Sequence, residues 1–407
     1  MLNDLWLLVS ALLILIGLLA SEGLLLIVGS LVVLIWLATK LWDRYAFRRV
    51  SHSRSLARHR AFIGDTLEYS VTLSNDKILP LIWVDIQDAF PEGLELLGAN
   101  VRSQSIDGTR QHTITTSLLP FQQVTWKYVL HCTKRGYHRI GPVRVRSGDI
   151  FGFGAAEVNY DETEHLLVYP RVVDLEQLNL PAEHPLGSGR GKRPLFQDTT
   201  RFIGQRDYLP TDPMKHIDWK ATARTSRLQT KVFEPVISLN VLVALNANTG
   251  EQPWETINRR LFERSVTIAA SVANHAAERG YTFGVLSNAV ATYTSRYLSV
   301  PLSASAGQLN LVFDALSMAA PYAVITLPEV LRSERASLPP GATVAVITAV
   351  LTQVLAREIA ELKGRGYQVL VLYTGDDAPI LDLPDVSLVS VGAAADVAEA
   401  HEPVLAE

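Results

Sequence analysis

Two apolar runs open the chain, and only three residues separate them. The first runs from Leu5 to Ala20 without a charge, and the second runs from Leu24 to Trp42 with Lys40 as its one charge. The second is long enough for a helix to cross a bilayer core of about 30 Å, and the first is close to that length. The break Ser-Glu-Gly leaves room only for a tight turn. A cleavable signal peptide would begin with basic residues, whereas this chain begins MLND. The pattern therefore predicts an uncleaved transmembrane helical hairpin over residues 1–45, in contact with membrane lipid through residues 5–42.

The segment after the second run predicts the orientation of this hairpin. Residues 43–60 contain six arginines and one acidic residue. Such a flank stays on the cytoplasmic side of a membrane. Because a hairpin returns to the side it left, both termini and all later domains are expected there. We therefore expect a two-span protein of the cell (inner) membrane with cytoplasmic soluble domains. The single cysteine, Cys132, excludes a disulfide within the chain and suits a reducing compartment.

Short alternating runs follow the hairpin. Examples between about residues 56 and 172 are TLEYSVTLSN and QVTWKYVLHC, and turn signals such as Asp107-Gly108 separate the runs. Strands at this spacing without a convincing helix predict a β-sandwich-like domain over residues 50–175. Nothing in it points to catalysis. The net charge of −4 gives no reason to expect a nucleic-acid partner.

The last part of the chain alternates between buried strands and amphipathic helices. VISLNVLVALN and ATVAVITAV are continuous apolar runs typical of parallel strands, and a long amphipathic helix between them ends at Gly280. The alternation predicts an α/β doubly wound sheet over residues 236–400. In such a sheet, binding sites lie at the carboxyl ends of the strands. There the sequence places Asn246, Asn248, Thr249 and Thr348.

The densest cluster of polar residues lies between these domains, in a linker over residues 176–235. YLPTDPMKHIDWKATAR, residues 208–224, predicts a short helix from Met214 to Arg224, with Asp212 as its N-cap and Pro213 in its first turn. Trp219 is expected to pack inward.

Two hypotheses for this cluster stay open. It is either a structural clasp, in which charged side chains pair among themselves, or a surface that binds a partner. The charged residues concerned are Arg206, Asp207, Asp212, Asp218 and Arg224. General acid–base catalysis by His216 and Asp218 is possible in principle, but no sequence feature marks a substrate pocket.

The same stretch resembles the family catalogued as domain of unknown function 58. The hallmark of that family is R-x-Y-x-x-G-D-x-x-R-x-I-D-W-x-x-[TS]-A-R-x-x-x-L. This chain departs from it with Thr211 in place of the glycine and Lys215 in place of the arginine. The resemblance extends to the apolar hairpin, the β domain and the last domain. The residues that match are Arg206, Tyr208, Asp212, Ile217, Asp218, Trp219, Thr222, Ala223, Arg224 and Leu228.

The resemblance implies a multidomain, membrane-anchored protein whose last domain is von Willebrand factor A-like. It also implies a MoxR-type AAA+ ATPase as partner, in complex assembly or chaperone-like work, with no cofactor and no catalytic activity. We therefore expect a membrane-tethered scaffold that is not an enzyme. The motif residues, as interface or clasp, would be Arg206, Tyr208, Asp212, Asp218, Trp219, Thr222 and Arg224.

A membrane-associated hydrolase is the alternative. The chain lacks the HExxH, GxSxG and Walker patterns, but an active site assembled from scattered residues would escape such a search.

The resemblance also bears on metal binding. A von Willebrand factor A domain can hold a divalent cation through D-x-S-x-S after its first strand, with a distant threonine and aspartate. Here Asn246 replaces the aspartate, Asn248 and Gly250 replace the serines, and Ala349 stands where an acid is expected. A hard cation prefers carboxylate and hydroxyl oxygens, and no carboxylate is left at these positions. We therefore predict a degenerate metal site at Asn246, Asn248 and Thr348 that stays empty, which disfavours a metal-dependent adhesion-type binder.

Overall fold

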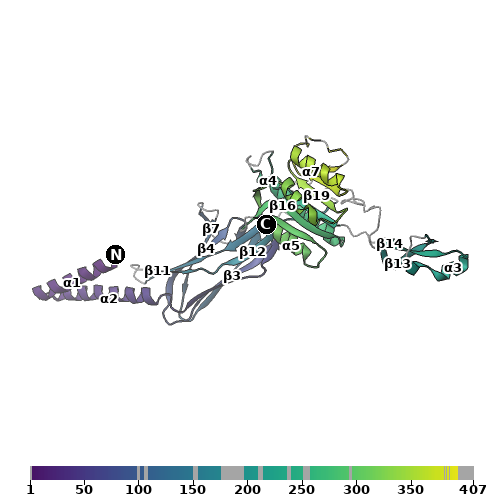
Figure 1. Ribbon diagram of the computed structural model, residues 1–407. Helices are drawn as coiled ribbons and strands as arrows, with labels where there is room; N and C mark the ends of the chain where they lie inside the picture. The colour runs from purple at the N-terminus through teal and green to yellow at the C-terminus, as the bar shows by residue number, and fades with distance from the viewer. Residues whose placement is uncertain are drawn as a thin grey trace. The chain divides into compact units, whose positions relative to one another are not determined.

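The computed structural model divides the chain into two compact units, Met1–Tyr169 and Pro170–Glu407 (Figure 1). Each unit is described by itself. The structure describes residues 2–98, 101–104, 109–149, 155–175, 197–209, 214–235, 240–250, 257–292, 296–379, 381, 383–384 and 386–392.

The first unit begins with two helices, α1 (Leu2–Ala20) and α2 (Gly23–Tyr45), which pack side by side (Figure 1). A glycine lies at their contact, because a Cβ on Gly29 would stand 2.6 Å from Cγ1 of Ile14. Small residues of this kind let helix backbones approach closely in membranes. Many large apolar side chains of the pair are exposed, such as Leu19 and Leu24. Among the described helices, α2 is the one long and apolar enough to cross a membrane.

Antiparallel sheets form the rest of the first unit. One has the strand order β1-β3-β8-β5 and another the order β11-β10-β4-β7-β6. A small third sheet, β2-β12-β9, pairs β12 with β2 in parallel. The strands are β1 (Val50–Leu56), β2 (Arg60–Phe62), β3 (Thr66–Asn75), β4 (Leu81–Pro91), β5 (Leu94–Leu97), β6 (Val101–Gln104), β7 (Thr109–Leu118), β8 (Gln123–Cys132), β9 (Gly136–Ile140), β10 (Val143–Gly148), β11 (Ala155–Tyr160) and β12 (Glu164–Tyr169).

The strands bury alternate residues between the sheets, as the period of two in their sequences predicts. Leu73 of β3, Ile86 of β4 and Val145 of β10 belong to one buried cluster. Trp42 of α2 and Ala46 belong to the same cluster, with Trp42 only 6% exposed. The apolar helix therefore ends inside the core of the β unit, with no linker between them.

The second unit is built on a seven-stranded sheet with the order β17-β16-β15-β19-β20-β21, and β18 pairs with β16. Five neighbouring strands are parallel to one another, namely β16, β15, β19, β20 and β21. Strand β17 is antiparallel to β16. The strands are β15 (Asn240–Leu245), β16 (Thr282–Ala291), β17 (Tyr297–Ser303), β18 (Ala319–Ala323), β19 (Thr343–Thr348), β20 (Gln368–Tyr373) and β21 (Ser387–Ser390).

Helices cover both faces of this sheet. Helices α6 (Leu327–Glu334) and α7 (Gln353–Gly364) share a buried cluster with Leu242 and Ala244 of β15. The alternate residues of β15 point to the opposite face, on which α4 (Arg259–Glu278) packs, with α5 (Gln308–Met318) beside it. The long helix predicted to end at Gly280 is thus α4, capped at its start by the side chain of Asn258.

The molecule is multidomain and mostly sheet, with an apolar N-terminal helix. These general features of the predicted fold class are confirmed.

A separate hairpin precedes this sheet along the chain. Strands β13 (Gln197–Asp207) and β14 (Gln229–Pro235) pair antiparallel, and a single turn of 3-10 helix (Met214–His216) and the helix α3 (Trp219–Thr225) lie between them in the sequence. The helix stands at the end of the hairpin (Figure 1).

Candidate functional site

The described residues of the predicted motif lie on α3 and on the strand ends beside it. The helix begins at Asp218, whose Oδ1 accepts hydrogen bonds from the backbone N–H groups of Lys220 (3.0 Å) and Ala221 (3.1 Å). Its Oδ2 accepts a hydrogen bond from Nε2 of Gln205 on β13, at 3.2 Å. Asp218 is therefore an N-cap that also joins the helix to the strand.

This arrangement corrects the predicted helix. A single helix from Met214 to Arg224 is wrong, because Ile217 forms a β-bridge with Thr230 and Asp218 has an extended backbone, which separate the 3-10 turn from α3. The predicted N-cap, Asp212, lies outside the described residues. The cap that the structure shows is Asp218.

A glutamine that the sequence analysis did not select connects the motif to β14. The backbone N–H of Gln229 donates to Oγ1 of Thr222 at 3.0 Å, and its carbonyl accepts from the N–H of Asp218 at 2.8 Å. Its side-chain amide donates to Oδ1 of Asp207. The N–H of Tyr208 donates to the carbonyl of Leu228 at 2.9 Å. These hydrogen bonds form a clasp of capping and amide contacts. In the sequence, Gln229 is simply the polar residue that follows the motif. The sequence pattern does not distinguish it from other polar residues nearby.

The remaining motif residues point away from the clasp. Trp219 is 69% exposed, so the expectation that it packs inward is wrong. Lys220 and Arg224 are also exposed. Arg206 is exposed, and its Nη1 donates to the backbone carbonyl of Asp207 at 3.1 Å. Among the described residues, Arg224 does not join the charge pairing that the clasp hypothesis assumed. The structure thus divides the motif into a hydrogen-bonded clasp and an exposed face.

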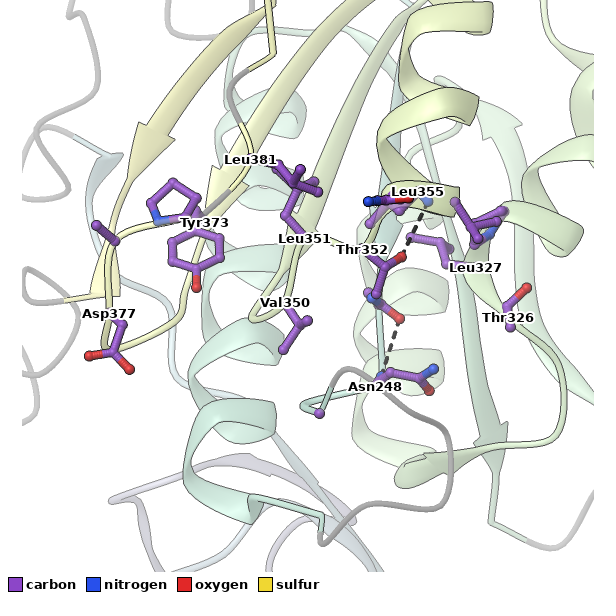
Figure 2. A pocket seen from close by; sticks show the side chains of 17 residues that line it. Asn248, Thr326, Leu327, Val350, Leu351, Thr352, Leu355, Tyr373, Asp377 and Leu381 are labelled. Atoms are coloured by element: carbon purple, nitrogen blue, oxygen red, sulfur yellow. Dashed lines mark hydrogen bonds between the residues drawn. The ribbon is translucent and has the colours of Figure 1, made fainter.

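A second candidate site lies at the carboxyl ends of β15, β19 and β20. It is a pocket of about 630 Å³. Figure 2 shows Tyr373 and Asp377 on one side and Asn248, Thr326 and Thr352 on the other. The described lining residues are Asn246, Asn248, Gly250, Thr326, Leu327, Pro328, Val350, Leu351, Thr352, Gln353, Val354, Leu355, Tyr373, Asp377, Ala378, Pro379 and Leu381.

Asn246 and Asn248 of the predicted metal site line this pocket, and the buried Thr348 is hydrogen-bonded to Asn246. Nδ2 of Asn246 donates to Oγ1 of Thr348 at 3.0 Å, and Oδ1 of Asn246 accepts from the N–H of Asn248 at 3.2 Å. Thr348 in turn donates to the carbonyl of Val350 at 2.6 Å. Asn288, which the sequence analysis missed, accepts from the N–H of Ala247 and donates to the carbonyl of Ile325.

These contacts do not suit a divalent cation. The side-chain oxygens of Asn246, Thr348 and Asn288 already accept backbone N–H groups. A cation would have to displace those donors and would gain no carboxylate from the three residues. Asp377 is the one carboxylate among the described lining residues. In the described part of the chain, no three His, Cys, Asp or Glu side chains are grouped to hold a metal ion.

The helix ends at the pocket are also internally satisfied. Helix α6 begins with a capping box in which Glu329 accepts from the N–H and the hydroxyl of Thr326, and these bonds lower the pKa of Glu329. Helix α7 is capped by the hydroxyl of Thr352. Burial raises the pKa of Tyr373, and the nearby charges of Asp377 and Asp376 raise it further. The Tyr373 phenol therefore stays protonated at neutral pH and does not act as a base.

Sequence comparison finds a family match in the part of the chain that holds both candidate sites. Residues 204–399 match the family model described as Protein of unknown function DUF58. A similar chain is the uncharacterized protein YeaD of Bacillus subtilis (strain 168), 29% identical over 245 residues. The match covers 60% of this chain and 57% of YeaD, so the chain spans little more than half of that relative's length. The DUF58 match includes α3 and the strand ends around the pocket.

Likenesses to solved structures are partial. A cohesin module of a Clostridium perfringens family 33 glycoside hydrolase matches 29% of this chain and 96% of its own, at 7% identity and a TM-score of 0.22. Native alpha-2-macroglobulin from Escherichia coli matches 30% of this chain and 17% of its own, at 18% identity and a TM-score of 0.23. At such TM-scores no argument about function rests on either.

Proposed function

We propose that this protein is a membrane-tethered scaffold that docks a protein partner through its motif segment, residues 206–228, without catalysis of its own. The partner class that the family resemblance implies is a MoxR-type AAA+ ATPase, in complex assembly or chaperone-like work. The observation that carries the proposal is the exposed face of α3. A motif that served only as a clasp would bury its aromatic residue, whereas Trp219 is 69% exposed.

The membrane arrangement is part of the proposal. Helices α1 and α2 would both cross the membrane, and the six arginines of residues 43–60 would hold the later domains on the cytoplasmic side. What supports a hairpin is the close packing of α1 on α2 at Gly29. The lipid-facing surface would be the exposed apolar side chains of residues 5–42.

The last sheet would be a von Willebrand factor A-like domain with a degenerate metal site. Support comes from its parallel strands, from helices on both faces, and from the polar residues at the carboxyl ends of its strands. In that setting, the asparagine–threonine contacts of Asn246 and Thr348 would replace the ion and hold the loops together.

The hydrolase alternative has less support. Such an enzyme needs a nucleophile or an activated water beside a base. Among the described lining residues of the pocket, the titratable side chains are Tyr373 and Asp377, and the phenol is held in its neutral form. No described pair there matches the arrangement that hydrolysis needs.

Co-purification tests the proposed function. The tagged full-length chain, solubilised in detergent, is mixed with the purified MoxR-type ATPase of the same organism, with and without ATP. We expect the ATPase to be retained in at least one nucleotide state, at a stoichiometry above that of an unrelated AAA+ ATPase. Retention of neither ATPase in either state contradicts the proposal.

A further inference from the structure

We propose that the outward face of α3 binds an acidic protein surface that has an apolar recess for the indole of Trp219. This inference rests on the proposed function, because it specifies the chemistry of the docking partner. The face is defined by Trp219, Lys220, Ala223 and Arg224 of the helix, with Arg227 directly after it, and is called the α3 face below.

Helix geometry places these side chains together. Successive residues of an α-helix are about 100° apart around its axis. Ala221 and the hydroxyl groups of Thr222 and Thr225 face the hairpin or the helix backbone, and Ala221 is buried. Trp219 and Ala223 then share one outward row, and Lys220 and Arg224 share the neighbouring row. The small side chain of Ala223 lies between the indole and the two cations, so a partner group can reach both.

The charge on this face is of one sign. From residue 219 to residue 228 the charged residues are Lys220, Arg224 and Arg227, and all three are exposed. Within the described part of the chain, none of the three forms an ion pair. The nearest acid in the sequence, Asp218, directs its carboxylate to the backbone of α3 and to Gln205. Among the described residues these cations therefore have no ion-pair partner, and a partner with surface carboxylates would supply the counter-charge.

The composition also matches the centre of a protein interface. Tryptophan and arginine are enriched among the residues that contribute most to protein–protein affinity, whereas aspartate and glutamate are depleted there. Leu209, Met214 and Leu228 add exposed apolar side chains close to α3 in the sequence. An indole that is 69% exposed loses its contact with water when a recess covers it, and this supplies the apolar part of the binding.

An anionic membrane is the competing occupant for a face with tryptophan and cations. A helix that lies in a membrane interface presents several large apolar side chains along one stripe. Helix α3 has seven residues, and Trp219 is its one large apolar side chain. Each cation near an anionic bilayer adds only about fivefold to partitioning. The α3 face therefore fits a protein recess better than a lipid surface.

Matched variants of the full-length chain test this inference. Trp219→Ala removes the anchor, and Arg224→Glu reverses a charge on the α3 face. Arg279→Glu is the control, since it makes the same charge change at an exposed position at the end of α4. Each variant keeps the Asp218 cap, so we expect α3 to stay folded. Amide hydrogen exchange of residues 219–225 checks this for each variant. Three probes are used: the MoxR-type ATPase, a synthetic peptide of alternating glutamate and leucine, and vesicles of phosphatidylcholine with phosphatidylglycerol.

We expect the ATPase to bind the unmodified chain and the Arg279→Glu control alike. Each α3-face variant should weaken this binding about thirtyfold, the loss typical of an interface hot spot. Added salt should weaken binding to the unmodified chain more than binding to Arg224→Glu.

The remaining outcomes separate the two proposals. ATPase binding that survives both variants overturns this inference and leaves the proposed function standing. No ATPase binding, with peptide binding that needs Trp219 and Arg224, contradicts the proposed function and supports an acidic partner of another kind. Binding of vesicles but of neither protein probe overturns the inference in favour of a membrane surface, and binding of no probe overturns it outright.

Discussion

At the scale of single residues, the first unit depends on a buried arginine. Arg54 is nearly buried, lies 3.7 Å from a carboxylate oxygen of Asp88, and donates to the carbonyl of Ile140 at 2.7 Å. The hydroxyl of Tyr69 donates to the other oxygen of Asp88 at 2.6 Å. Gly141 makes room for the guanidinium, because a Cβ there would stand 2.5 Å from Nη1 of Arg54. The arginine cannot move aside without breaking its hydrogen bond to Ile140 and weakening its ion pair with the buried Asp88.

Gly141→Ala should therefore destabilise the first unit strongly. The positive φ of +95° costs a side chain about 1–2 kcal/mol, and the steric overlap with Arg54 adds about 1–3 kcal/mol. Gly64→Ala is the control, since φ is +92° there and nothing lies within 4 Å of the added Cβ. Urea denaturation of the full-length chain in detergent measures both. Equal losses in the free energy of unfolding for the two variants would show that the Arg54 side chain moves aside without destabilising the first unit.

His52 should make the first unit sensitive to acid. Burial, together with the nearby positive charge of Arg54, lowers the pKa of His52 from 6.5 to about 4. Between these values the unfolded chain binds a proton that the folded chain does not bind. The contribution of His52 to stability is therefore complete above pH 6.5 and decreases by about 3 kcal/mol as the pH falls to 4.

The measurement is the urea midpoint of unfolding at several pH values between 7 and 4, for the unmodified chain and for His52→Phe. The urea midpoint of the variant should fall less steeply with decreasing pH, because the phenylalanine ring cannot bind a proton. A residual slope is expected from His138, whose pKa burial also lowers. An unchanged slope in His52→Phe would contradict the assignment.

At the scale of elements, α3 depends on its cap more than on its length. A helix of seven residues is too short to be stable alone, so the contacts of Asp218 and Gln229 must hold it. Asp218→Ala removes three accepted hydrogen bonds and should cost about 1–2 kcal/mol of local stability. Asp218→Asn keeps an acceptor oxygen and should cost less. Hydrogen exchange of the amides of residues 219–225 reports both. Equal protection in the alanine variant and the unmodified chain would refute the capping role.

The loops at the carboxyl ends of β15 and β19 contain the predicted degenerate metal site, which we expect not to bind Mg²⁺. Because the oxygens of Asn246 and Thr348 already accept backbone N–H groups, Mg²⁺ should produce no binding isotherm in calorimetry of the full-length chain. A tight isotherm that is lost in Asn246→Ala would show that the ion displaces these donors.

Periodicity predicted the long elements well and the short ones poorly. The run that became α4 has a clear amphipathic pattern and several turns, and the run that became β15 is continuously apolar. Helix α6 was not predicted, because eight residues make only about two helical turns, which is too short a window for a helical period to be recognised. The inward packing of Trp219 failed for a different reason. Its hydrophobicity predicts burial, whereas which row of a short helix faces the hairpin depends on the Asp218 cap and Gln229, a contact that no local pattern encodes.

At the scale of the whole molecule, the arrangement across the membrane can be tested with the chain's own chemistry. The one native thiol, Cys132, is buried, so it gives little background labelling. Glu22→Cys places a thiol at the exposed turn between α1 and α2, and Lys127→Cys places one on the exposed side of β8. With a membrane-impermeant maleimide on intact spheroplasts, we expect label at position 22 and none at position 127 until lysis. Label at both positions, or at 127 alone, would contradict a two-span hairpin with cytoplasmic domains.

The absence of a linker between α2 and the β unit has a mechanical consequence. Trp42 and Ala46 are embedded among the side chains of β3, β4, β7 and β10, so the end of the apolar helix is packed into the core of the sheets. A tilt of α2 within the bilayer would therefore be transmitted as a rotation of the β unit, without the damping that a flexible tether would introduce. If α2 crosses a bilayer, as proposed, the thickness of that bilayer would then set the orientation of the β sheets relative to the membrane.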